Sequence, residues 1–131
     1  MTSRRKIEEL SAEERLTEAV TVQRKLCERY GAPFVSSPGH LKVGLARNIR
    51  TSGLKPLNGL RHPPQGDTTG WYIWAGEEFG TSEDFFQPLH VIHLVDECPM
   101  ALKFLGLAPG LRFLVADHHE DVWQDPILLK V

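Results

Sequence analysis

The chain reads Trp71-Tyr72-Ile73-Trp74-Ala75 between two glycines, and this run of aromatic and apolar residues carries no charge. Aromatic and β-branched residues are favoured in strands, and a strand that is covered on both faces is apolar along its whole length. The run therefore predicts a central β-strand at the core of a sheet.

Two further regions show the alternation of a half-buried strand. Over residues 41–49, apolar Leu41, Val43 and Leu45 are separated by smaller or polar residues. Residues 111–116 also read as a strand, with Phe113 on one of its faces. Strict alternation places one set of side chains on the buried face of a sheet. We expect one or two short strands more, at residues 122–123 and 127–129.

The clearest helix signal covers residues 11–30. Ser11 is followed three residues later by Glu14, the spacing of a capping box, and Gly31 is placed to end the helix. An apolar stripe at three- and four-residue spacing contains Leu16, Val20, Leu26, Cys27 and Tyr30. Residues 90–97 and 99–105 predict two shorter helices, joined at Cys98 before Pro99.

Residues 50–70 are rich in glycine and proline. The segment is longer than the ~12–15 residues at which structureless loops become uncommon, so we expect a functional or mobile loop. The order of elements predicts an α+β fold, with an N-terminal helix and a small, mainly antiparallel sheet. A helix pair is inserted before the C-terminal strands. We expect one domain over residues 1–131, in which residues 1–10 form a flexible N-terminal segment.

The composition is that of an ordinary globular domain, with 131 residues, 41% hydrophobic and 24% charged. No apolar run approaches the ~18 residues of a membrane span. Cys27 and Cys98 are too few for a disulfide framework, and neither belongs to a CxxC pair. Arg4-Arg5 is not followed by the apolar segment of an export signal. We therefore expect a cytoplasmic protein with no membrane partner.

The formal net charge of −2 conceals an asymmetry, because residues 1–69 carry +5 and residues 70–131 carry −7. An acidic surface of that size would steer a basic partner and repel nucleic acid. The alternative is that the two halves fold together and their charges intermix on one surface. The basic residues lie mostly on the first helix among glutamates, so no nucleic-acid partner is expected.

The sequence contains no residue pattern typical of catalysis or metal binding. His90 and His93 lack the HExxH pattern, and polar clusters such as His118-His119-Glu120 also collect in ordinary turns. Neither a nucleophile elbow nor a phosphate-binding glycine loop is present. We therefore expect no enzymatic activity, no catalytic residue, no metal and no cofactor.

Acidic and aromatic side chains are the best candidates for binding a protein partner. Aromatic residues anchor protein interfaces, and complementary charge raises association rates and sets specificity. Trp71, Trp74 and Phe113 are expected in the core, so they are left out of this set. The expected partner-binding residues are Glu77, Glu78, Phe79, Glu83, Asp84, Phe85, Asp117, Glu120 and Asp121.

Three segments carry a resemblance to a known family: Gly70-Trp71-Tyr72-Ile73-Trp74-Ala75-Gly76-Glu77, Asp84-Phe85-Phe86-Gln87-Pro88-Leu89-His90-Val91 and Glu120-Asp121-Val122-Trp123. They resemble a bacterial family that was first described as a domain of unknown function. It was later grouped with the immunity proteins of polymorphic toxin systems, as immunity protein family thirty-three. The similarity also takes in residues 31–35 and 60–64, and so covers about residues 30–131.

The resemblance implies an immunity protein that binds a cognate bacterial toxin and blocks its active or substrate-binding site. The resemblance names no catalytic residue. We expect a monomer or a small homo-oligomer. Two alternatives stay open. One is a ligand-binding or structural module, with Trp71 and Trp74 lining an apolar pocket beneath the long loop. The other is a small metal-dependent hydrolase that uses His118, His119 and either Asp117 or Asp121.

Overall fold

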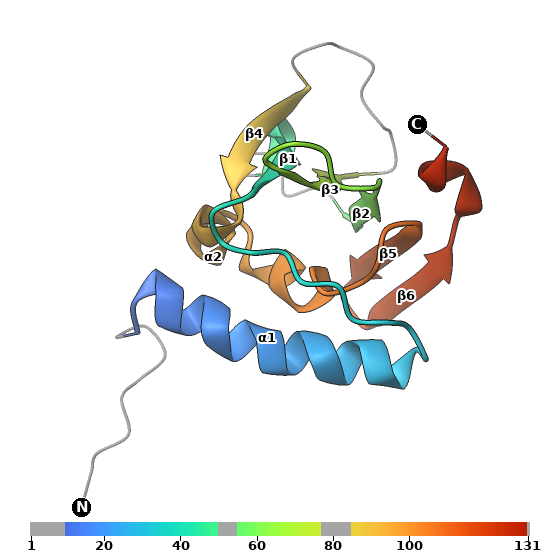
Figure 1. Cartoon of the computed structure of the whole chain (residues 1–131), viewed down its shortest axis with the longest axis horizontal. Helices are drawn as coiled ribbons and strands as arrows, with labels where there is room; N and C mark the ends of the chain where they lie inside the picture. The colour runs from blue at the N-terminus through green and yellow to red at the C-terminus, as the bar shows by residue number, and fades with distance from the viewer. Residues whose placement is uncertain (1–9, 50–54, 77–84, 131) are drawn as a thin grey trace, which may run out of the picture.

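A six-stranded sheet forms the centre of the computed structural model, which describes residues 10–49, 55–76 and 85–130 (Figure 1). The order of strands across the sheet is β4-β1-β3-β2-β5-β6. β1 and β3 run parallel, and the other four pairings are antiparallel, so the expected α+β fold with a mainly antiparallel sheet is confirmed. The strands are β1 (Lys42–Ala46), β2 (Leu57–Arg61), β3 (Thr68–Ala75), β4 (Phe86–His90), β5 (Leu111–Ala116) and β6 (His119–Gln124).

The N-terminal helix α1 (Ala12–Arg29) begins and ends where the sequence predicts. The backbone N–H of Glu14 donates to the Ser11 hydroxyl at 3.1 Å, and the Ser11 N–H donates to the Glu14 carboxylate at 3.2 Å. Gly31 follows the helix with a φ of 63°, a left-handed conformation that glycine adopts without steric cost. The capping box is therefore confirmed.

The helical segment between β4 and β5 also follows the prediction in outline. It consists of the 3₁₀ helix Val91–His93, α2 (Leu94–Glu97) and the 3₁₀ helix Pro99–Phe104. Cys98 separates α2 from Pro99, which is the expected joint. His90 is the last residue of β4 rather than the first of a helix. The residues of this segment pack against α1 on one face of the sheet.

The expectation of a long loop over residues 50–70 is wrong for residues 57–61, which form the buried strand β2 between β3 and β5. It is also wrong for residues 68–70, where β3 begins. Gly59 and the buried cation Arg61 make β2 difficult to recognise from the sequence. A Cβ atom added at Gly59 would lie 2.1 Å from the Phe113 ring, so only glycine leaves room for that ring. Phe113 in turn stacks on Phe104 at a centroid distance of 4.0 Å.

Two other differences from the sequence prediction lie at the sides of the sheet. β4 was not predicted, because Pro88 in its middle breaks the pattern of a strand. Residues 127–129 do not form a strand but belong to the 3₁₀ helix Pro126–Leu129. Its Leu128 packs on the face of the sheet that is turned away from α1.

The two faces of the sheet bury different sets of side chains. Trp71, Ile73 and Phe113 belong to the larger cluster, which the helices cover. Trp74 belongs to a smaller cluster on the opposite face, with Ala46, Leu60 and Leu128. The three residues expected in the core, Trp71, Trp74 and Phe113, are all buried.

Arg61 at the end of β2 is 1% exposed and has no carboxylate partner among the described residues. Its Nε donates to the Thr69 carbonyl at 2.9 Å, and its Nη2 donates to the Ser36 carbonyl at 3.0 Å. Nη1 donates to the carbonyls of Val35 at 2.8 Å and Leu107 at 2.7 Å. Desolvation lowers the pKa of the guanidinium to about 10, so the group stays charged at neutral pH.

We predict that Arg61→Lys lowers the free energy of unfolding by about 3 kcal/mol or more, because it leaves several buried carbonyl oxygens without donors. Urea denaturation of both proteins measures the difference. The control is the reverse exchange, Lys25→Arg, at an exposed site on α1, which should change stability by less than about 0.5 kcal/mol. A similarly small loss for Arg61→Lys would contradict the role given to this side chain.

Candidate functional site

The structure describes four of the nine side chains that were expected to bind a partner. Phe85 lies directly before β4, Asp117 lies in the turn between β5 and β6, and Glu120 and Asp121 lie on β6. β4 and β6 are opposite edges of the sheet with four strands between them, so Phe85 and the three acids are not brought together (Figure 1). The other five expected residues lie outside the described part of the chain: Glu77, Glu78, Phe79, Glu83 and Asp84.

Asp117 lies in the two-residue turn that joins β5 to β6. Ala116 pairs with His119 across the hairpin, and Asp117 has a φ of 45°. Two-residue hairpins favour positive φ, and aspartate tolerates it better than most residues. The Asp117 carboxylate accepts a hydrogen bond from Lys55 Nζ at 2.5 Å, and both side chains are exposed. Exposed pairs of this kind contribute little to stability.

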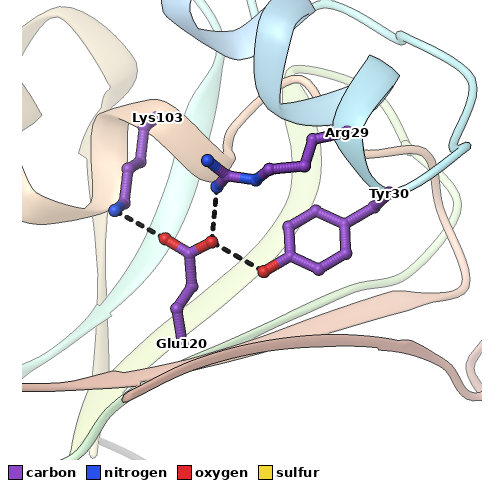
Figure 2. A network of polar contacts seen from close by, with 4 residues as sticks. All are labelled: Arg29, Tyr30, Lys103 and Glu120. Carbon is purple, nitrogen blue, oxygen red and sulfur yellow. Dashed lines mark hydrogen bonds and ion pairs between the residues drawn. The ribbon is translucent and has the colours of Figure 1, made fainter. Parts of the chain in front are cut away.

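Glu120 is the centre of a polar network that joins α1 and the 3₁₀ helix Pro99–Phe104 to β6 (Figure 2). Its Oε2 accepts hydrogen bonds from Arg29 Nη2 at 2.5 Å and from the Tyr30 hydroxyl at 2.6 Å. Its Oε1 lies 2.6 Å from Lys103 Nζ. The carboxylate therefore holds the C-terminal hairpin against the helices.

Burial alone would raise the pKa of the Glu120 carboxyl, but its partners outweigh this effect. Hydrogen bonds from Lys103 and Tyr30, together with the charges of Lys103 and Arg29, hold its pKa below the ordinary value. The Tyr30 hydroxyl shows the opposite shift, because burial and the hydrogen bond to Glu120 raise its pKa. Glu120 is therefore charged, and Tyr30 neutral, across the physiological range.

Asp121 points away from this network. Successive side chains of a strand lie on opposite faces, so Asp121 and Trp123 share the face opposite Glu120. Trp123 is 37% exposed, and the Arg112 guanidinium lies 5.5 Å from its ring centroid. Arg112 Nη1 also donates to the Asp125 carboxylate at 3.1 Å. Sequence reasoning missed Trp123, whose exposure depends on a register that the sequence does not specify.

Ion pairs between the two halves of the chain show that their opposite charges intermix. Arg15 pairs with Asp96 at 3.4 Å, and the pairs of Arg29 with Glu120 and of Lys55 with Asp117 also join the basic half to the acidic half. Within the described part of residues 70–131, Asp121 is the one acidic side chain that has no ion pair or hydrogen bond. The surface around β6 is therefore less negative than the sequence alone suggests.

The residues behind the two alternative hypotheses do not meet. Trp71 and Trp74 are buried on opposite faces of β3, so they do not line a common pocket. No group of three or more His, Cys, Asp and Glu side chains in the described ranges could hold a metal ion. An open groove of about 490 Å³ lies elsewhere, and Ile49, Leu57, Cys98 and Met100 are among its lining residues. None of the helices in the described ranges is long and apolar enough to cross a membrane.

We predict that Glu120→Gln lowers the free energy of unfolding by about 1–2 kcal/mol at pH 7, because two cations lose a half-buried partner. Asp121→Asn on the same strand is the matched control, with an expected change below about 0.5 kcal/mol. Denaturation at a series of pH values measures both differences.

The pH dependence of this difference has a definite sign. A folded-state pKa below the unfolded value of about 4.3 stabilises the protein above that value, and the stabilisation is lost as the pH falls through the folded pKa. The advantage of the wild-type protein over Glu120→Gln should therefore shrink below about pH 4. A difference that stays constant down to pH 2 would show that the carboxylate charge contributes nothing.

The comparisons with known proteins agree with the resemblance of the sequence. No curated protein and no solved structure matches the chain. The family model described as the Imm33-like domain matches residues 22–125, which run from α1 to the residue that follows β6. This match covers most of the chain and includes every strand of the sheet, and the chain therefore belongs to the Imm33-like domain family.

Proposed function

We propose that this protein is an immunity protein that binds a cognate bacterial toxin and covers its active or substrate-binding site. The observation that carries the proposal is the match to the Imm33-like domain over residues 22–125. The role requires binding alone, so it calls for no catalytic residue, metal or cofactor. We further propose that the protein acts in the cytoplasm, as a monomer or a small homo-oligomer.

We place part of the proposed contact surface for the toxin on the β5–β6 hairpin. Asp117 lies exposed at its tip, and Asp121 and Trp123 lie on the outer face of β6. A carboxylate beside an exposed indole can meet a basic and apolar surface of a partner. Glu120 is proposed to contribute to toxin binding indirectly, because its polar network fixes the position of β6.

The proposed contact set retains the residues that the sequence analysis singled out between β3 and β4. The acids Glu77, Glu78, Glu83 and Asp84 add negative charge, and Phe79 and Phe85 add aromatic area. Phe85 is half-buried against Phe86, with a centroid distance of 4.9 Å. A toxin that attacks nucleic acid has a basic active site, so an acidic surface would bind it in place of phosphate.

We predict that co-expression of this chain restores growth to bacteria that produce the toxin domain encoded by the neighbouring gene. A variant with Arg61→Lys is the control for folding, because its destabilised sheet should protect less well. Colony counts with and without the chain measure protection. Growth inhibition that the wild-type chain leaves unchanged, although it is produced in folded form, would overturn the proposal.

We predict that Asp121→Lys slows association with the same toxin domain by about 3- to 10-fold at low ionic strength. The effect should largely disappear near 1 M salt, where the screening length is about 3 Å. Surface plasmon resonance measures both rates. Glu18→Lys makes the same charge change at an exposed site on α1 and is the control. The same charge reversal at Glu77, Glu78 and Asp84 tests the other acids of the proposed contact set. If none of these changes alters the association rate, electrostatic steering is excluded.

A further inference from the structure

The outer edge of β6 presents backbone groups that no element of the described structure covers. The Asp125 N–H donates to the Gly110 carbonyl at 2.7 Å, which continues the β5–β6 ladder and fixes its phase. In an antiparallel ladder the paired residues alternate between bonded and non-bonded. The main-chain groups of His119, Asp121 and Trp123 therefore face β5, and those of Glu120, Val122 and Gln124 face the open edge.

These edge groups have no partner within the described residues. From residues 10–49, 55–76 and 85–130, no backbone or side-chain hydrogen bond from outside β6 reaches the N–H or C=O of Glu120, Val122 or Gln124. The side chains of Glu120 and Val122 do not cover the edge either, because the Glu120 carboxylate is held by α1 and Val122 packs on the core. Figure 1 shows β6 at the border of the sheet, with α1 beside one of its faces. As far as the described residues extend, the edge is therefore open to another strand.

The opposite edge of the sheet is built differently. The N–H of Arg47 donates to the Phe85 carbonyl, and the N–H of Val91 donates to the Leu41 carbonyl, which fixes the phase of the β1–β4 ladder. Pro88 then has its nitrogen on the open side, where it offers no N–H. A proline in this position prevents another strand from pairing. β6 carries no proline between His119 and Gln124, so only one of the two edges is blocked in this way.

We propose that an extended segment of the toxin pairs with the open edge of β6 as a seventh strand. This inference rests on the proposed function and names the part of the toxin that the immunity protein recognises. Strand addition supplies main-chain hydrogen bonds for affinity, and side chains on alternate positions supply specificity. The partner is therefore recognised along β6 rather than only at the tip of the hairpin.

The side chains of β6 define the chemistry of the added strand. Asp121 has no cation of its own, and exposed Trp123 lies two residues away on the same face. The toxin segment should place a lysine or arginine beside Asp121 and an apolar or basic side chain beside Trp123, since both can contact an indole face. β6 contains no lysine or arginine, so a second copy paired along this edge would bring Asp121 no cation.

The test is amide hydrogen exchange of this chain, free and bound to the toxin domain encoded by the neighbouring gene. In the free protein the amides of Glu120, Val122 and Gln124 should exchange rapidly, and those of Asp121 and Trp123 should be protected by β5. Binding should slow exchange at the three edge amides by more than about tenfold. A bound complex in which these three amides still exchange rapidly would overturn strand addition and leave the proposed function standing.

A pair of variants tests the same edge by affinity. Gln124→Pro removes an N–H on the open side and leaves the β5 ladder intact, whereas Gln124→Thr keeps the N–H. We expect about tenfold weaker binding for the proline variant and less than a twofold change for its control. Equal affinities for two folded variants would contradict the inference.

Two other outcomes separate the inference from its alternatives. If the wild-type chain does not bind the toxin domain at all, the proposed function fails and strand addition fails with it. If the edge amides become protected without toxin as the protein concentration rises, a second copy occupies the edge, and the assignment to the toxin is wrong.

Discussion

The guanidinium of Arg61 is hydrogen-bonded to main-chain carbonyls from three separate segments, and the rest of the sheet depends on it. Its donors reach Val35 and Ser36 before β1, Thr69 in β3 and Leu107 before β5. The bonds to the Thr69 and Leu107 carbonyls are buried, and a buried carbonyl left without a donor costs about 1–3 kcal/mol. The charge is delocalised over five N–H groups and shared by several dipoles, which is why arginine rather than lysine suits this position. Through these bonds β2 connects the helical layer to the strands that carry the candidate site.

The elements predicted correctly are those in which local signals and burial agree. The capping box at Ser11 and Gly31 determine the ends of α1, and the uncharged run from Trp71 to Ala75 is buried apart from Tyr72, which is 38% exposed. β2 could not be predicted, because Gly59 and Arg61 resemble loop residues until the Phe113 ring and the surrounding carbonyls are known. Both residues are required by contacts with distant parts of the chain, and a local sequence pattern does not predict such contacts.

The candidate site was predicted only in part for a similar reason. Glu120 and Asp121 are adjacent and chemically alike, yet the register of β6 turns one toward Arg29 and Lys103 and the other toward solvent. The register cannot be predicted from the sequence alone, so both acids were expected at the surface. The open edge of β6 was beyond the sequence as well, because it depends on the order of strands and on the position of Pro88 at the other edge. Membership of the Imm33-like domain family supplies the expected role, and the geometry of β6 supplies a place for it.

The most direct test of this account is a titration of the toxin domain's own activity with increasing amounts of the purified chain. Binding that covers an active or substrate-binding site predicts a linear loss of activity that reaches zero at equal molar amounts. The same end-point should be found whichever of the two proteins is added first, because the chain inhibits by binding and catalyses no reaction. Full toxin activity in the presence of a large excess of folded chain would contradict the account.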